Sequence, residues 1–176
     1  MFIGHAPASY LWTRWLLKRW GTPLRFLSRR KAMIFGVCAG LLPDLDLIYF
    51  YLVDRRQHLH HGYWTHIPSF WVAVFSAALL LGLMLRRPPM VLVSIIAGSN
   101  VLLHLILDTV AGKVRWLFPL SRRDFVWVDI PAVHDWWVWN FILHWTFGLE
   151  VLLVIGALYV AYTKSGNEQA AGEAVS

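Results

Sequence analysis

Two pairs of residues in this chain have the types and spacing needed to bind a metal ion. His104 and Asp108 are four residues apart, so they share one face if the segment is helical. An imidazole and a carboxylate placed in this way are typical zinc ligands, with bonds of about 2.0–2.2 Å. Asp44 and Asp46 directly follow Pro43 inside an apolar run. An acid at the centre of a membrane segment costs about 2.5–3.5 kcal/mol, so both need partners, for which a cation is well suited.

The elements that must position these residues are apolar runs long enough to span a bilayer, which takes about 20 residues. The 176-residue chain is 58% hydrophobic, above the roughly 45–50% of soluble domains. The runs are 32–53, broken near the proline, 68–85, 90–111 and 136–162, and the segment 2–20 either spans obliquely or lies at the interface. We predict an all-α integral membrane bundle of four to five helices, with one domain over 1–163 and a disordered tail over 164–176.

The distribution of basic residues predicts the orientation of the bundle. The net charge of +6 comes from Lys and Arg in several short loops, which is typical of membrane proteins rather than of nucleic-acid-binding surfaces. The loops 21–31 and 86–89 and the C-terminus carry more of these residues than the opposite side, so we expect them to be cytoplasmic. The loops 54–65 and 112–135 then lie on the outer side, and no nucleic-acid partner is expected.

The candidate ligands share one depth in this arrangement. At 1.5 Å per residue, four of them lie within about 5–14 Å of the outer boundary: Asp44, Asp46, His104 and Asp108. His61 and His66 flank the outer start of the helix over 68–85. The sequence therefore predicts a metal site at the outer membrane–water boundary.

Several assignments stay open at this stage. Residues two apart on a regular helix point in different directions, so either Pro43 turns both Asp44 and Asp46 toward the site or one of them orients a histidine. His58 and His60 are expected to be solvated loop residues. His144 fits either a hydrogen-bonded helix contact or an additional ligand.

Four short segments, in this order, resemble the YdjM-like membrane-bound metal-dependent hydrolases. They are Gly40-Leu41-Leu42-Pro43-Asp44-Leu45-Asp46, His61-Gly62-Tyr63-Trp64-Thr65-His66, His104-Leu105-Ile106-Leu107-Asp108-Thr109 and Leu117-Phe118-Pro119-Leu120. The family pattern resembles LPDxD, HRGxTHS, HxxxD and PF, and His5 matches its N-terminal histidine. Gly62, Tyr63, Ile67 and Leu120 depart from the pattern, which affects substrate contacts more than metal binding.

The resemblance implies a zinc site. The family is itself similar to zinc-dependent phospholipase C and P1-type nucleases, in which an early His, an Asp followed by a His, and a later His-x-x-x-Asp form a zinc cluster. Carried over to this chain, one ion is bound by Asp46, His61, His104 and Asp108, and a second is bound by His5 and shared through Asp108. His66 and His144 are further candidates. One or two divalent ions, with Zn²⁺ as the expected metal, are therefore implied.

We accordingly expect a membrane-bound metal-dependent hydrolase that acts on phosphoester bonds of a lipid or lipid-linked substrate. A metal-activated water would attack the phosphorus, with Asp44 as general base or as a residue that orients a histidine. Arg122 and Arg123, with Arg55 and Arg115, would contact the phosphate head group. The expected location is a bacterial or archaeal cytoplasmic (inner) membrane, among membrane lipids, with the site facing outward.

A different class of function remains open. A metal-ion transporter, or a membrane protein that a metal stabilises without catalysis, would also place acids and histidines in the membrane. An ion pathway needs polar residues at successive depths through both leaflets, whereas a hydrolase needs one cluster at one depth. The sequence shows mainly the second distribution.

Overall fold

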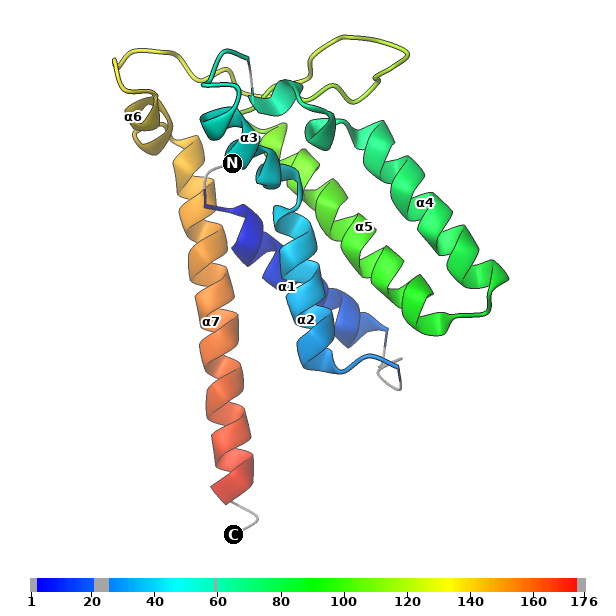
Figure 1. The fold of residues 1–176 in the computed structure, drawn as a ribbon. Coiled ribbons are helices and arrows are strands. Elements are labelled where there is room, and N and C mark those ends of the chain that lie inside the picture. Colours follow the sequence, from blue (N-terminus) through cyan, green and yellow to red (C-terminus); the bar gives the residue numbers. More distant parts are fainter. Residues whose placement is uncertain (1–2, 21–25, 59, 174–176) are drawn as a thin grey trace.

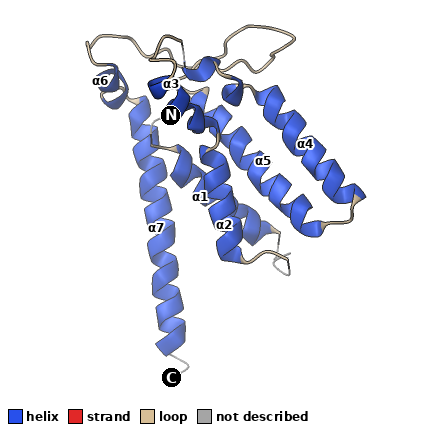
Figure 2. Ribbon diagram, in the orientation of Figure 1, coloured by secondary structure: helices blue, strands red, loops and turns tan. Residues whose placement is uncertain are grey.

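The computed structural model describes residues 3–20, 26–58 and 60–173, with side chains described as far as residue 163. Within these residues it is all-helical, without a strand, which confirms the predicted fold class (Figures 1 and 2). The longer helices are α1 (His5–Arg19), α2 (Arg29–Leu41), α4 (Pro68–Met84), α5 (Pro88–Asp108) and α7 (Thr146–Glu173). The shorter ones are α3 (Asp46–Leu52), α6 (Trp137–Ile142) and the 3₁₀ turns η1 (Pro43–Leu45), η2 (His60–Gly62) and η3 (Trp64–His66).

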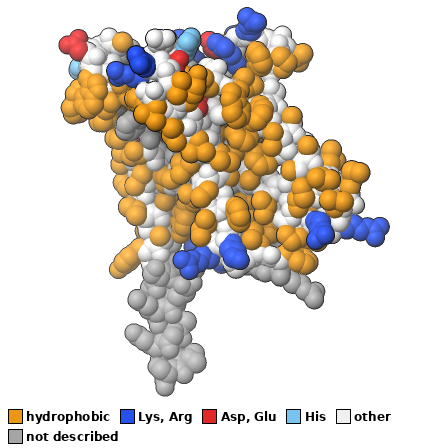
Figure 3. Space-filling view, viewed as in Figure 1, with side chains coloured by type: hydrophobic (Ala, Val, Ile, Leu, Met, Phe, Trp, Pro, Cys, Tyr) orange, Lys and Arg blue, Asp and Glu red, His pale blue; other side chains and the backbone are white. Residues whose placement is uncertain are grey.

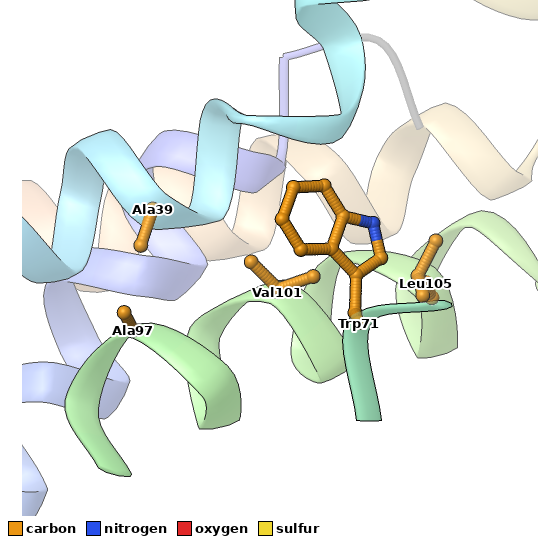
Figure 4. Packing of buried hydrophobic residues seen from close by; sticks show 5 residues of the cluster. All are labelled: Ala39, Trp71, Ala97, Val101 and Leu105. Carbon is orange, nitrogen blue, oxygen red and sulfur yellow. The ribbon is translucent and has the colours of Figure 1, made fainter. Parts of the chain in front are cut away.

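Helix α5 is the centre of the bundle, because it packs against α1, α2 and α4, while α7 packs against α1 (Figure 1). One buried core cluster joins Ala39 of α2, Trp71 of α4, and Ala97, Val101 and Leu105 of α5 (Figure 4). A helix with partners on several sides is held in place along its length, so residues on its buried face have fixed positions.

The first membrane segment is broken at the predicted position. Helix α2 ends at Leu41, and Pro43 lacks the N–H needed to continue the α-helical pattern. The chain makes the turn η1 and continues as α3, with an angle of 56° between the two parts. Asp44 therefore lies in a tight turn and Asp46 at the first residue of α3, rather than on one regular helix.

Two helices are long and apolar enough to cross a membrane, namely α5 and the part Thr146–Thr163 of α7. The bent pair α2–α3 is a third candidate span if it is counted as one, and α4 is apolar but has 17 residues. Figure 3 shows hydrophobic side chains over most of one face and Lys and Arg near its two ends. This distribution fits helices that cross a bilayer.

The C-terminal part differs from the prediction of one helix over 136–162. The structure divides this segment into α6 and α7, with a break at 143–145. The break follows from a local cap, because the Thr146 backbone N–H donates to His144 Nδ1 (3.4 Å) and begins a new helix. Helix α7 is described as far as Glu173, and residues 174–176 lie outside the described part. The disordered tail over 164–176 stays a prediction. The Ala, Glu and Gln residues of this segment favour helix.

Candidate metal centre

Eight His and Asp side chains meet at one end of the bundle, and we call this set the cluster. It contains His5, Asp44, Asp46, His60, His61, His66, His104 and Asp108, each within 4.0 Å of another member. The residues come from the start of α1, the α2–α3 bend, the turns η2 and η3, and the end of α5, which lie together at the top of Figure 1. The structure thus brings together every residue predicted as a metal ligand except His144.

The His104–Asp108 pair has the geometry expected from its spacing. His104 Nε2 lies 2.9 Å from Asp108 Oδ2, one turn further along α5, and both side chains are almost fully buried. His104 Nδ1 lies 2.7 Å from the carbonyl oxygen of Gly40. A carbonyl can only accept, so Nδ1 carries the proton and Nε2 of the neutral ring presents its lone pair to the cluster.

In a first group the ligand atoms of His66, His104 and Asp108 lie within 4.8 Å of one another, and Asp44 Oδ1 lies 3.7 Å from both His66 Nε2 and His104 Nε2. The four His–Asp distances among them lie between 2.9 and 3.7 Å. Ligands about 2.1 Å from a zinc ion in tetrahedral geometry lie about 3.4 Å from one another. His66 Nε2 and His104 Nε2 are buried without a hydrogen-bond partner among the described residues, although carboxylates lie this close. The spacing therefore suits atoms that surround a common ion better than atoms that bond directly.

A second group contains His5. Its Nε2 lies 3.0 Å from Asp108 Oδ1 and 4.0 Å from Asp44 Oδ2, while its ring stacks on His104 with centroids 3.6 Å apart. Asp44 and Asp108 each direct one oxygen to the first group and the other toward His5. This arrangement could hold two ions with shared carboxylates, in line with the predicted sharing through Asp108.

Asp46 faces the opposite side of the histidine rings. Its Oδ2 accepts a hydrogen bond from Thr65 and lies 2.9 Å from His66 Nδ1, and its Oδ1 lies 2.9 Å from His60 Nδ1. A carboxylate on Nδ1 fixes the ring orientation and leaves Nε2 for a metal. The sequence predicts Asp46 as a metal ligand and leaves the role of Asp44 open. This geometry instead favours Asp44 as a ligand and Asp46 as the residue that orients His60 and His66.

The carboxylates control the electrostatics of the site. Burial lowers the pKa of His66, but Asp108, Asp44 and Asp46 outweigh this effect and raise it to about 11. The pKa of His60 is also raised, because Asp44 and Asp46 outweigh its burial. The excess of negative charge that favours these protons would equally favour a divalent cation.

His60 is a member of the cluster that the sequence did not indicate. Expected to be a solvated loop residue, it is instead half-buried, with Nε2 3.3 Å from Asp44 and its ring edge-on to His66. It is adjacent to His61 in the sequence, and sequence spacing alone does not show which of the two histidines belongs to the site. His61 packs against Gly112, where a Cβ would lie 2.6 Å from His61 Cε1.

The remaining predicted site residues lie elsewhere. His144 Nδ1 lies 2.9 Å from Thr146 Oγ1 and serves the start of α7. Arg123 stacks over Phe125, 5.5 Å from its centroid, and lines a separate cavity of about 350 Å³. Arg122 and Arg55 are exposed and Arg115 pairs with Asp124, so the recorded contacts of the described residues join none of these arginines to the cluster.

Glu150 supports the cluster from outside. This buried residue of α7 accepts hydrogen bonds from the backbone N–H groups of Ile3 (2.5 Å) and Gly4 (2.9 Å), directly before His5. A carboxylate at this position accepts hydrogen bonds from amides that have no partner within the helix, and its negative charge interacts favourably with the positive end of the helix dipole. It therefore holds the start of α1, and with it His5, against α7.

Comparison with known proteins identifies one family. The sequence profile described as YdjM inner membrane protein matches residues 1–170. No curated protein and no solved structure matches the chain. The likeness to phospholipase C and P1-type nucleases therefore stays a prediction.

Proposed function

This chain belongs to the YdjM inner membrane protein family, and we propose that it is a metal-dependent hydrolase of phosphoester bonds in a lipid or lipid-linked substrate. Its apolar helices and its family make it an integral inner-membrane protein. One observation carries the proposal, namely that His66 Nε2 and His104 Nε2 each lie 2.9–3.7 Å from Asp44 Oδ1 and from Asp108 Oδ2.

The residues present fit a divalent cation. Buried imidazole nitrogens without hydrogen-bond partners, beside carboxylates, form a nitrogen–oxygen ligand set that suits zinc. A cation bound here would lower the pKa of a water molecule and polarise a phosphoryl oxygen. We propose Asp44, Asp108, His66 and His104 as ligands, His5 and His61 as ligands of a second ion or as supporting contacts, and Asp46 as the residue that orients His60 and His66.

Substrate would reach the cluster at its exposed edge. Asp44, His60 and His61 are the partly exposed members, with 18–24% of each side chain accessible, whereas the other members are nearly buried. Asp44 Oδ1 lies 3.3 Å from His60 Nε2, so this pair can pass a proton from the reacting water to solvent. The bias of basic residues between the loops supports an edge that faces outward.

The transporter alternative is less well supported. The acids and histidines of the cluster lie at one end of the bundle. Glu150 holds the start of α1 at that same end. Deeper between the helices the polar residues are uncharged, such as Thr13 and Asn100, and they hydrogen-bond directly to each other. One cluster at one depth suits hydrolysis better than ion passage.

The first test measures metal content. The protein is purified in detergent without added chelator, and zinc per chain is measured by mass spectrometry for the wild type, His104→Ala and Asp108→Ala. Asp124→Ala is the matched control, because this acid is exposed and pairs with Arg115. We expect one or two zinc ions per chain in the wild type and the control, and a loss in the two cluster variants. Unchanged stoichiometry in both cluster variants would overturn the metal site.

The second test measures activity. Release of phosphorylated head groups from mixed lipid micelles is followed before chelation, after chelation, and after zinc is restored. We expect release that stops on chelation and returns with zinc. Release that ignores the chelator would contradict metal catalysis. Zinc flux into protein-containing vesicles without any release would instead support transport.

A further inference from the structure

An apolar cavity of about 690 Å³ lies against the cluster, within the size range of ligand pockets. Its walls come from the bend after α2, from α3, from residues 63–65 and from α4, and include Leu42, Leu45, Tyr49 and Trp71. Asp46 is the only charged residue among its described lining residues. Such a cavity suits a hydrocarbon group and offers almost nothing to a charged head group.

The polar end of the cavity is formed by Asp46 and Thr65, which hydrogen-bond to each other. The same Asp46 carboxylate contacts His66 Nδ1, and Nε2 of that ring faces Asp44 and Asp108. The imidazole ring of His66 therefore separates the end of the cavity from the Asp44 and Asp108 carboxylates of the cluster.

The cavity is bordered by large apolar side chains that the bundle leaves exposed. Leu45, Tyr49 and Trp64 line it and are 57%, 51% and 58% exposed. Leu45 and Tyr49 belong to the bent pair that counts as a candidate span. In a membrane protein, exposed apolar residues on a span face the hydrocarbon of the bilayer, so the cavity is continuous with that surface.

We propose that this cavity binds a hydrocarbon chain of a membrane lipid whose head group lies at the exposed edge of the cluster, beside Asp44 and His60. Naming that lipid as the substrate rests on the proposed function, whereas occupation of the cavity by the chain does not. The enzyme would thus select its substrate by an apolar tail as well as by a phosphoester.

The test is photolabelling of the full chain in nanodiscs of phosphatidylethanolamine and phosphatidylglycerol, with a trace of phosphatidylglycerol that carries a diazirine in one acyl chain. A chelator is present, so neither metal nor turnover is needed. Trp71 reports on the cavity, because it lines the interior and is 9% exposed, whereas Leu80 of α4 is 59% exposed and reports on bulk lipid. We expect labelling at both residues. Labelling at Leu80 without labelling at Trp71 would overturn the proposal.

Leu45→Trp fills the cavity, and Leu83→Trp is the matched control. Leu83 is 56% exposed and lines a second apolar cavity beside Gly82, at the other end of α4. We expect labelling of Trp71 to fall several-fold in Leu45→Trp and to stay unchanged in Leu83→Trp. An equal fall in both variants would overturn the proposal. The thermal unfolding midpoint in detergent verifies that Leu45→Trp is folded, and Tyr49→Trp replaces it if it is not.

Activity separates this proposal from the proposed function. With zinc present, Leu45→Trp should lower the rate several-fold on a long-chain phospholipid and leave the rate on its dihexanoyl counterpart unchanged. Labelling of Trp71 without any hydrolysis would support the cavity and contradict the hydrolase. Hydrolysis without labelling of Trp71 would support the hydrolase and contradict binding of a lipid chain in the cavity.

Discussion

The interface between α1, α2 and α5 carries buried polar residues along its length, but its two ends satisfy them differently. Next to the cluster, further along these helices, lies a group that we call the seam: Ser9, Thr13, Gly36, Gly40 and Asn100. Asn100 Nδ2 donates to Thr13 Oγ1 (2.9 Å) and to the Ile96 carbonyl (2.8 Å), while Asn100 Oδ1 is buried without a hydrogen-bond partner among the described residues. Gly36 and Gly40 let α1 approach α2 so closely that a Cβ on either would overlap the Thr13 or Ser9 side chain.

At the cluster end, His5 of α1 and His104 of α5 lie with His66 of the turn η3, and all three are as deeply buried as the polar residues of the seam. His5 Nε2, His66 Nε2 and His104 Nε2 are buried without hydrogen-bond partners among the described residues, although carboxylate oxygens lie 2.9–3.7 Å away. Unpaired polar atoms in an apolar interior are costly. The comparison teaches that the polar side chains of the seam let the helices pack directly against one another, whereas the ligand atoms of the cluster are spaced so that they could hold a cation.

The largest expected effect distinguishes the two aspartates of the cluster. Asp44→Asn removes a proposed ligand, and Asp46→Asn removes a carboxylate that orients His60 and His66. Loss of an orienting carboxylate typically weakens metal binding by roughly 10–100-fold, so Asp44→Asn should weaken it further. Competition with a fluorescent zinc chelator measures both dissociation constants. A larger effect for Asp46→Asn would restore the assignment that the sequence predicted.

A seam variant tests the other end. Gly40→Ala would place its Cβ 2.8 Å from Ser9 Cβ, so α1 and α2 must separate. Overpacking of this kind costs about 1–3 kcal/mol, and the thermal unfolding midpoint in detergent should fall. Zinc binding should weaken as well, because the Gly40 carbonyl contacts His104 Nδ1.

Two further variants show whether close packing is the cause. Gly148→Ala is the matched control, because nothing lies within 4 Å of the added Cβ in α7 and Ala favours helix by up to about 1 kcal/mol. Adding Ser9→Gly to Gly40→Ala removes the overlapping side chain and should recover much of the lost midpoint. A double variant as unstable as Gly40→Ala alone would show that the seam is not limited by this contact.

The parts of the fold that follow local rules could be predicted from the sequence. Pro43 cannot continue a helix, and the bend lies there. The spacing of His104 and Asp108 fixes their shared face whatever surrounds the helix. The last helix could not be divided in advance, because its break depends on a hydrogen bond between His144 and Thr146 within an otherwise apolar run.

The site was predictable in its members more than in their roles. Depth along the membrane segments brings Asp44, Asp46, His104 and Asp108 to one level before any contact is known. The contacts between individual carboxylate oxygens and ring nitrogens depend on the backbone conformation of the turns η1 to η3. Sequence periodicity does not predict that conformation. His60 illustrates this limit, because it adjoins His61 in the sequence yet contacts different carboxylates.

Glu150 offers an intermediate effect, because its hydrogen bonds to Ile3 and Gly4 connect it to the cluster through the start of α1. Glu150→Gln keeps an oxygen acceptor but loses the charge that strengthens its bonds to Ile3 and Gly4, so we expect a loss of about 1 kcal/mol in stability. Zinc affinity should fall less than in Asp46→Asn, because only His5 gains freedom. Asp124→Asn controls for loss of a negative charge. A complete loss of zinc in Glu150→Gln would place this carboxylate in the metal site itself.

The smallest effect is expected at an exposed His–Asp pair beside the cluster. His58 Nδ1 lies 2.6 Å from Asp54 Oδ1, and the hydrogen bond from His58 lowers the pKa of Asp54 to about 2. A depressed carboxyl pKa means that the contribution of the pair to stability is present above the unfolded value of about 3.9 and is lost as the pH falls through about 2. In His58→Ala, an NMR titration should find the Asp54 pKa raised toward its ordinary value, although the backbone N–H of residue 58 and Tyr63 still lower it, while zinc content stays at the wild-type value. His58 and Asp54 bond directly to each other, so a loss of zinc in His58→Ala would show that the boundary of the cluster extends beyond His60.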